Sequence, residues 1–416
     1  MVTKKVVHKI KIARDLLVDE GIIAVGIRGL EFIQKHTRKN GRSNKKSKIH
    51  TVARYEDVLK TELTDKPPVW NMGFAKRMSF VWIMPPPGKG SGGHLNIFRF
   101  INFLEKSGHD CKIYLFVDGK HGDIEGVLNV MGDSYPKIKA AYSMEWLDSI
   151  DSLPNVHGIF ATSWETAYAS YAIESNAKRF YFVQDFEPHF YPVGGLSTLA
   201  ENTYKLGFYG ITAGNWLKRK LATDYGMDTD SFDFGADEDI YELTNKSNRK
   251  EIFYYARPHT ERRGFAVGIL ALDIFHSKHP EYIINLVGWD VSEYDIPFPY
   301  KNLKTLEIDE LSTLYNRCAA GLVLSYTNMS LLPLELLRCG TIPVVNDGDN
   351  NRLVSNNKYI AYSNNDPHSL AAKLSEVVSR PDKNDYAQRA SRSVKNTGWG
   401  SSGVKFVSII EREMKR

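Results

Sequence analysis

The sequence has few cysteines: Cys111, Cys318 and Cys339 are the only three in 416 residues. They are far apart in the chain and form neither a C-x-x-C pair nor a Cys/His spacing typical of zinc sites, which argues against a disulfide framework and against structural zinc. The chain also lacks an apolar run of the roughly 20 residues that a membrane-spanning helix needs, and its start lacks the apolar core of a signal peptide. These absences predict a protein of the reducing cytoplasm.

Core-forming residues, in contrast, are abundant. Apolar residues make up 42% of the chain and charged residues 25%, proportions typical of a globular protein. Because 416 residues exceed the size of one ordinary hydrophobic core, we expect two domains with additional segments.

Positive charge is concentrated in residues 1–50, which contain 13 Lys and Arg against four Asp and Glu. This segment has a net charge of +9 while the whole chain has +5, so the remainder is net negative. Its apolar residues recur at helical spacing, which predicts an amphipathic helix that either packs on the protein or lies on an anionic membrane surface. Nucleic acid is a poorer candidate partner, since no aromatic residues interleave with these charges.

Short apolar strands alternate with helical segments from residue 79 onward. The first series predicts strands at 79–84, 111–117, 156–161, 179–183 and 209–212, with a helix at 95–107. The second series predicts strands at 251–255, 282–287, 303–306, 321–325, 342–345 and 359–362, with a helix at 331–339. This order is typical of an α/β protein with two doubly wound, Rossmann-like domains facing each other across a cleft, where ligands bind at the carboxyl ends of the strands.

One carboxylate, Glu335, lies between a predicted strand and a Gly-Thr-x-Pro turn. Pro333 opens the expected helix and Gly340 ends it, so Glu335 lies in an early turn. There it could accept hydrogen bonds from ribose hydroxyls while the helix N-terminus faces an anionic ligand. The alternative is that it only complements the helix dipole.

Arginines follow the first strand of the second series. Arg257 comes directly after this strand, and Arg262 and Arg263 precede the next helix. Guanidinium groups suit the oxygens of a diphosphate and could stabilise a leaving nucleoside diphosphate without a metal ion. The alternatives are a salt bridge for Arg257 and a basic surface turn for Arg262.

Two further motifs are ambiguous. Gly88, Gly90 and Gly93 formally match the dinucleotide fingerprint, with Asp118 as the ribose partner, but three prolines lengthen the turn beyond that of a tight fingerprint. Gly92 and Gly93 still allow a phosphate or a sugar to approach the backbone. Asp347 and Asp349 form a D-x-D pair, which we interpret as a loop and helix cap rather than a metal site.

Together these residues resemble the retaining glycosyltransferases of the GT4 type, which have the GT-B fold. The resemblance covers about residues 78–410, is nearest to S-layer glycan rhamnosyltransferases, and rests on Gly92-Gly93, Gly235-Ala236-Asp237 with Tyr241, Arg257, Arg263-Gly264 and residues 335–345. It implies an acceptor-side domain over 76–243, a nucleotide-sugar domain over 244–395 and a helix over 396–416 that crosses back to the first domain. The helical basic extension over 1–75 lies outside the common pattern of the family.

The resemblance also implies roles for individual residues. Arg257 and Arg263 would bind the diphosphate, Glu335 the ribose, and the backbone near Leu306 the base. Gly92 and Gly93 would approach the diphosphate and sugar, and Asp185 would lie beside the reacting sugar. The family has a sugar-facing carboxylate eight positions before Glu335; Thr327 stands there instead, which suits a donor with different hydroxyl groups, such as a 6-deoxy sugar.

The implied function is sugar transfer with retention, from dTDP-L-rhamnose to a growing, lipid-linked or polymeric cell-surface glycan. No cofactor, metal ion or nucleic acid is expected. The protein would be cytoplasmic or peripheral at the inner face of the membrane. Two alternatives share the fold: a sugar-nucleotide epimerase, and a non-catalytic sugar-nucleotide-binding protein.

Overall fold

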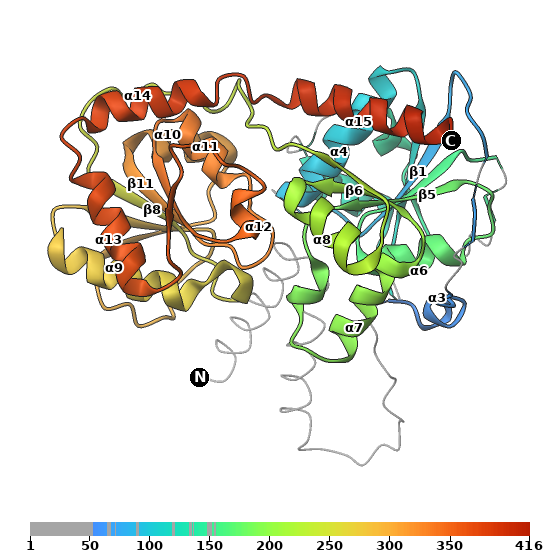
Figure 1. Cartoon of the computed structure of the whole chain (residues 1–416), viewed down its shortest axis with the longest axis horizontal. Coiled ribbons are helices and arrows are strands. Elements are labelled where there is room, and N and C mark those ends of the chain that lie inside the picture. The colour runs from blue at the N-terminus through green and yellow to red at the C-terminus, as the bar shows by residue number, and fades with distance from the viewer. Residues whose placement is uncertain are drawn as a thin grey trace, which may run out of the picture. The chain divides into compact units, whose positions relative to one another are not determined.

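The computed structural model describes residues 53–416 except 65–67, 71, 89–90, 119–120, 133–134, 136, 148–151 and 154. These residues divide between two compact units (Figure 1). Unit 1 comprises the described residues up to Ile211 with 221–230 and 406–416, and unit 2 comprises 212–220 and 231–405. The predicted basic extension over residues 1–50 lies outside the described residues.

Unit 1 is built on a seven-stranded sheet with the order β3-β2-β1-β4-β5-β6-β7. Strands β1 to β5 run parallel, because each is joined to the next by a crossover. The strands are β1 (Ser79–Met84), β2 (Asp110–Leu115), β3 (Glu145–Trp146), β4 (Gly158–Ala161), β5 (Lys178–Val183), β6 (Tyr209–Ala213) and β7 (Thr229–Phe232). The helices of this part of the chain are α3 (Tyr55–Leu59), α4 (Gly92–Lys106), α5 (Ile124–Met131), α6 (Trp164–Ala172), α7 (Gly195–Asn202) and α8 (Asn215–Tyr225).

An aromatic cluster forms the core of unit 1. The Trp82 ring stacks on Phe160 with ring centroids 4.1 Å apart. Phe406, from helix α15 (Trp399–Met414), packs on Phe100 of α4 at 4.8 Å. The end of α15 is also tied to the sheet, since Lys178 Nζ donates to the Glu413 carbonyl at 2.7 Å. Residues 406–416 are therefore part of the core of unit 1.

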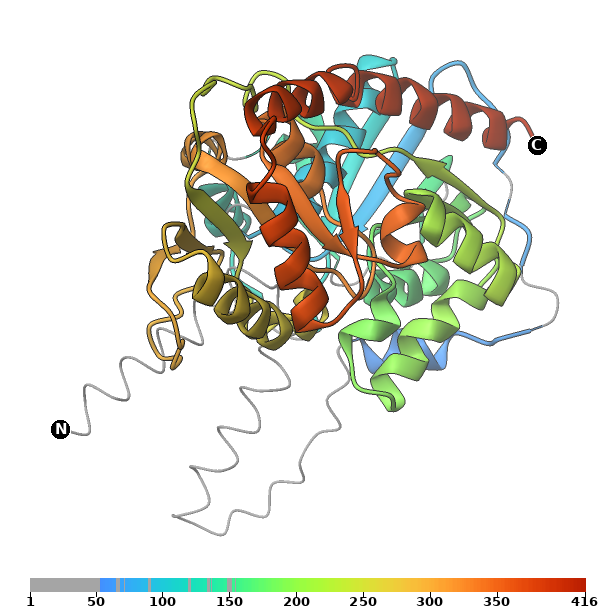
Figure 2. The ribbon, with the colours of Figure 1, turned by 60° about the vertical axis from the view of Figure 1, so that its left-hand side comes forward.

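Unit 2 is a second doubly wound sheet, with six parallel strands in the order β10-β9-β8-β11-β12-β13. Its strands are β8 (Glu251–Tyr255), β9 (Ile283–Val287), β10 (Tyr300–Lys304), β11 (Cys318–Val323), β12 (Ile342–Asn346) and β13 (Ala361–Ser363). The helices are α9 (Phe265–Lys278), α10 (Ile308–Arg317), α11 (Leu332–Arg338), α12 (Asp349–Arg352), α13 (Pro367–Val378) and α14 (Lys383–Ser393). Helices α9 and α13 pair on one face of this sheet, and α11 and α14 pair on the other (Figures 1 and 2).

The structure confirms the predicted fold class of two doubly wound α/β units. The predicted strands 79–84 and 251–255 coincide with β1 and β8. The bounds of the strand predicted at 303–306 were wrong, because β10 begins at Tyr300 and ends at Lys304, whose φ of 57° breaks the extended backbone. Short β3 and β7 were not predicted. Within the described residues, no helix combines the length and the apolar character that crossing a membrane requires.

Candidate functional site

The strand order of unit 2 reverses between β8 and β11. From β8 the chain proceeds to β9 and β10 on one side, and then returns to β11, β12 and β13 on the other. Loops that leave neighbouring strands in opposite directions open a crevice, and doubly wound sheets bind their ligands there, beyond the carboxyl ends of the strands. In this unit that position is occupied by residues 256–264 after β8 and by residues 324–331 after β11.

These two loops are bonded to each other. Arg263 Nη1 donates to Ser325 Oγ at 2.9 Å, and the Tyr326 amide donates to the Arg262 carbonyl at 3.0 Å. Gly264 has a φ of 62°, and a Cβ on it would lie 2.6 Å from the Tyr326 ring. A side chain at Gly264 would therefore push the loops apart, so glycine is required for the arginine turn to reach Ser325.

Arg257 lies at the same edge of the sheet, and its side chain contacts the backbone that follows β9. Its Nη1 donates to the Gly288 carbonyl at 3.5 Å, directly beyond the end of β9. Gly288 has a φ of 111°, and a Cβ there would lie 3.2 Å from Arg257 Cδ. The two predicted arginines thus flank the point where the strand order reverses, one toward β9 and one toward β11.

A network of buried amides holds the loop after β11. Asn346 Oδ1 accepts from the Ser325 amide at 2.8 Å, and Asn346 Nδ2 donates to the Ser325 carbonyl at 2.9 Å. Asn351 Nδ2 donates to the Asn346 carbonyl at 2.7 Å. Yet Asn351 Oδ1 and Ser330 Oγ are buried without a hydrogen-bond partner in the described part of the chain. Such unsatisfied atoms need an explanation, and a bound ligand would provide one.

Thr327, predicted to contact the donor sugar, belongs to the same loop. It is fully buried, and its carbonyl accepts from Asn350 Nδ2. Leu306, predicted near the base, lies in the connection between β10 and α10 and packs partly against the core. Its position beyond the carboxyl end of β10 is on the same edge of the sheet as the arginines.

Glu335 is half-buried on α11, one helix beyond the Ser325 loop. Burial raises the pKa of Tyr241, and the Glu335 carboxylate, to which the Tyr241 hydroxyl is hydrogen-bonded, adds to this effect. Burial also raises the pKa of Tyr315, with Glu335 as the next cause. Tyr241 was predicted only as part of a motif and Tyr315 was not predicted, since nothing in the local pattern connects either tyrosine to Glu335.

The D-x-D pair occupies the loop after β12. Asp347 receives a two-point ion pair from Arg352, with Nε at 2.5 Å and Nη2 at 2.8 Å, and this bond lowers the pKa of Asp347. Asp349 begins α12 and pairs with Arg219. Among the described residues, no three His, Cys, Asp or Glu side chains lie together in a group that could hold a metal ion.

Gly92, Gly93 and Asp185 lie at the carboxyl edge of the sheet in unit 1. Gly92 begins α4 after β1, and the carbonyl of Gly93 accepts from Gln184 Nε2 at 3.1 Å, beyond the end of β5. Asp185 follows Gln184, and its Oδ1 accepts from the Phe186 amide at 2.9 Å. A Cβ on Gly92 would meet nothing within 4 Å. Packing within unit 1 therefore does not explain this glycine, whereas close approach of a ligand would.

Two buried carboxyl groups near Asp185 were missed by sequence reasoning. Glu187 Oε2 accepts from the Trp164 amide at 2.7 Å, at the start of α6, and Oε1 accepts from the Tyr181 hydroxyl at 3.2 Å. Burial raises the pKa of Glu165 to about 7, and burial together with the neighbouring Glu165 raises the pKa of Glu187. Glu187 thus anchors the loop that carries Asp185 to the N-terminus of α6.

Comparisons with known proteins agree with this architecture. Residues 250–375, most of unit 2, match the family described as WsaF, C-terminal domain. The chain is 30% identical over 329 residues to the O-antigen biosynthesis protein RfbC of Myxococcus xanthus. This match covers 76% of the chain and 26% of RfbC, so the chain spans about a quarter of the length of that relative.

Solved structures extend the similarity to both units. The crystal structure of Anabaena Alr3699/HepE in complex with UDP and glucose superposes with a TM-score of 0.60 at 14% identity, covering 80% of this chain and 100% of HepE. WaaG, a glycosyltransferase involved in lipopolysaccharide biosynthesis, gives 0.57 at 12% identity, covering 80% and 99%. The chain therefore has the GT-B fold, and its residues 250–375 match the WsaF C-terminal domain.

Proposed function

We propose that this protein is a retaining glycosyltransferase whose nucleotide-sugar donor binds at the strand-order reversal of unit 2. The observation that carries the proposal is the position of two guanidinium groups there: Arg257 beside Gly288, and Arg263 bonded to Ser325. Paired guanidinium forks match the oxygens of a diphosphate. The WsaF-type domain and the GT-B fold support the same assignment.

In the proposed reaction the bond between the anomeric carbon and the diphosphate oxygen breaks, and the diphosphate keeps the electron pair. Arg257 and Arg263 stabilise the negative charge that develops on it, which is where electrostatic catalysis is most effective. The acceptor hydroxyl attacks from the face that the diphosphate leaves, and its proton passes to a phosphate oxygen. Glu335 binds the ribose, the backbone near Leu306 binds the base, and the loop of Thr327 faces the sugar.

Unit 1 supplies the acceptor side in this proposal. Gly92 and Gly93 would bring the start of α4 close to the diphosphate and sugar, and Asp185 would contact the reacting sugar. The loop of Asp185 is suited to such a role because Glu187 fixes it to α6. The proposed sugar is L-rhamnose from dTDP-L-rhamnose, since the resemblance is to S-layer rhamnosyltransferases and Thr327 replaces a carboxylate. The O-antigen role named for RfbC supports a cell-surface polysaccharide as acceptor.

The decisive experiment follows release of nucleoside diphosphate from a panel that includes dTDP-L-rhamnose and UDP-glucose, with and without a rhamnosyl acceptor. The proposal predicts acceptor-dependent release that is fastest with dTDP-L-rhamnose. Conversion of the donor to an epimer without diphosphate release would identify an epimerase instead. Donor binding without any turnover would identify a non-catalytic binding protein.

A further inference from the structure

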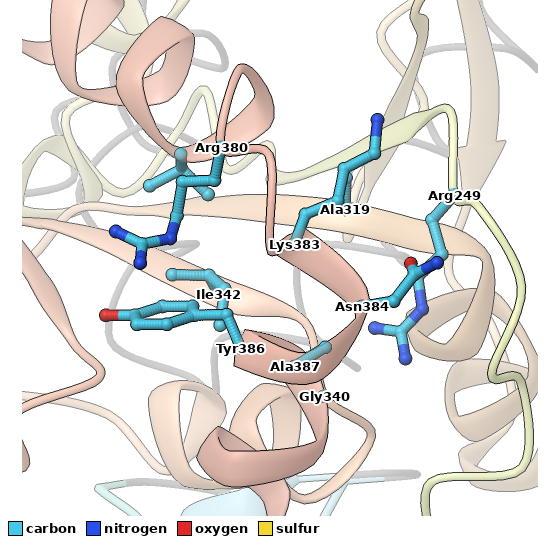
Figure 3. Close-up of a pocket in the computed structure, with 10 residues that line it drawn as sticks. Arg249, Ala319, Gly340, Ile342, Arg380, Lys383, Asn384, Tyr386 and Ala387 are labelled. Carbon is cyan, nitrogen blue, oxygen red and sulfur yellow. The ribbon is translucent and has the colours of Figure 1, made fainter.

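Two adjoining hollows lie at the amino ends of the strands of unit 2, on the edge opposite the loops of Arg257 and Arg263. The smaller, with a volume of about 20 Å³, is next to the starts of β11 and β12. The wider, of about 300 Å³, lies beside the edge strand β13. The two hollows share Val377, Arg380 and Tyr386. Figure 3 shows the smaller hollow, with Arg380 over the Tyr386 ring at one end and Arg249 at the other.

Cationic side chains dominate the lining of both hollows. The lining contains one carboxylate, Glu376, and six cationic side chains: Arg249, Arg352, Lys358, Lys373, Arg380 and Lys383. Three of the cations have an acidic partner, because Arg352 pairs with Asp347, Lys373 with Glu376, and Arg380 with Asp382. Across the described residues, the other three contact no carboxylate. This edge of unit 2 therefore carries an excess of positive charge, although the chain outside residues 1–50 is net negative.

Arg249 is the most unusual of these cations. It is only 6% exposed, and its guanidinium donates to two neutral acceptors, the Asn245 carbonyl at 2.9 Å and the Cys318 carbonyl at 3.5 Å. A buried charge without a counter-ion is costly. The Arg249 guanidinium also packs closely on the backbone of Gly340, which has a φ of 73°, since a Cβ on this glycine would lie 2.9 Å from Arg249 Nη2. An anion in the adjoining hollow would supply the missing charge.

The other two arginines are held in fixed orientations by aromatic rings. The Arg380 guanidinium lies 3.9 Å from the centroid of the Tyr386 ring, and that of Arg352 lies 4.3 Å from that of Tyr362. Nε and Nη2 of each guanidinium already donate to a carboxylate, Asp382 for Arg380 and Asp347 for Arg352, so an oxyanion would bind the remaining N–H groups on the edge of each stacked guanidinium. These arginines are therefore oriented before any ligand arrives, which lowers the entropic cost of binding.

We infer that the two hollows form a second anion site on unit 2, which binds a phosphoryl or diphosphoryl group. An oxygen of this group enters the small hollow toward Arg249, because a volume of about 20 Å³ admits one atom of roughly water size. The remainder lies in the wide hollow, where Lys358 neutralises it and the Asn356 side chain lines the wall. This site is separate from the proposed donor site and does not depend on it.

The test is a calorimetric titration of the full chain with inorganic pyrophosphate in the presence of saturating dTDP, repeated in the Arg263→Ala background so that the donor site cannot account for the heat. We expect one binding event that Lys383→Gln and Lys358→Gln each weaken roughly tenfold, the loss of about one charge-assisted bond. Lys278→Gln is the matched control: this lysine is exposed on α9, outside both hollows, and its replacement should leave binding unchanged. Thermal unfolding of each variant checks that folding is intact.

A second arm distinguishes a soluble ligand from a lipid headgroup. Vesicles of phosphatidylglycerol and of phosphatidylcholine are mixed with the same variants, each also lacking residues 1–52, so that the basic extension does not contribute. Pyrophosphate binding that depends on Lys383 indicates a soluble phosphoryl ligand, and binding only to phosphatidylglycerol vesicles with the same dependence indicates a lipid-borne one. The inference is overturned if neither probe binds, or if Lys278→Gln reduces binding as much as Lys383→Gln.

Discussion

Arg263 and Ser325 are 62 positions apart, yet Arg263 Nη1 donates to Ser325 Oγ at 2.9 Å. This bond joins the loop after β8 to the loop after β11. The hydroxyl of Ser325 in turn donates to the Asn328 carbonyl at 2.7 Å, so the arginine is attached to a loop that is itself held in place. A guanidinium positioned in this way can stabilise charge on a leaving group without first being ordered.

The first prediction concerns the two arginines. Arg257→Ala and Arg263→Ala should each lower kcat/KM by about one to two orders of magnitude, because a charge-assisted bond contributes roughly 1.5 to 3 kcal/mol. Turnover is measured as diphosphate release. Ser325→Ala is the matched control, since it removes the bond that positions Arg263 but keeps the charge of the arginine. It should lower kcat/KM by less than either arginine variant. Wild-type rates in both arginine variants would contradict the proposed donor site.

The second prediction separates ribose binding from the tyrosine contact of Glu335. Glu335→Gln should weaken dTDP binding in calorimetry, because the amide is a poorer acceptor for two ribose hydroxyls than a carboxylate. Tyr241→Phe removes the hydroxyl bonded to Glu335 and leaves the carboxylate in place. If Glu335→Gln binds dTDP as tightly as wild type, the role of Glu335 is to interact with the tyrosines and with the helix dipole, and it does not bind the ribose.

The third prediction is that EDTA leaves the activity unchanged. The proposed mechanism assigns the stabilising positive charge to Arg257 and Arg263, and Arg352 already engages the Asp347 carboxylate. Asp347→Asn should therefore affect stability more than turnover. If EDTA abolished the activity and manganese restored it, the result would contradict this prediction and support a metal site at the D-x-D pair.

The fourth prediction concerns pH. The pKa of Glu165 is raised from 4.5 to about 7, so the folded protein keeps a proton that the unfolded chain releases above pH 4.5. Stability should consequently fall as pH rises from 4.5 to about 7, by at most about 1.4 kcal/mol per pH unit for this group. Glu165→Gln carries no such proton and should unfold at a higher temperature than wild type at pH 8, with a smaller difference at pH 5. An equal shift at both pH values would exclude the ionisation as its cause.

The fifth prediction concerns residues 1–50, with a net charge of +9. The full chain should float with anionic liposomes at low salt and detach as salt rises, because each Lys or Arg near an anionic surface contributes about 1 kcal/mol over roughly one Debye length. A chain that begins at Ala53 should bind less. If both versions stay in the soluble fraction, the extension serves packing or assembly.

Local sequence signals were sufficient to predict much of the fold. The apolar runs that became β1, β8 and β12 are bounded by polar residues or turn formers, and a fully buried parallel strand needs such a run. Pro333 and Gly340 mark the two ends of α11 for reasons internal to the backbone. The same local logic identified Glu335, Arg257 and Arg263 as candidates, because polar residues that follow buried strands lie at the edge of a sheet.

The sequence by itself therefore determined the elements, their order and the chemical groups available at their ends. Tertiary structure alone decided which of those groups meet. The pairing of β8 with β11 brings Arg263 to Ser325, Glu187 reaches the Trp164 amide, and Arg249 is enclosed beside the turn of Gly340. No periodicity in the sequence predicts these contacts, because each depends on which strands become neighbours. Strand order is set by burial and by chain crossings over the whole unit, and the contacting residues do not set it.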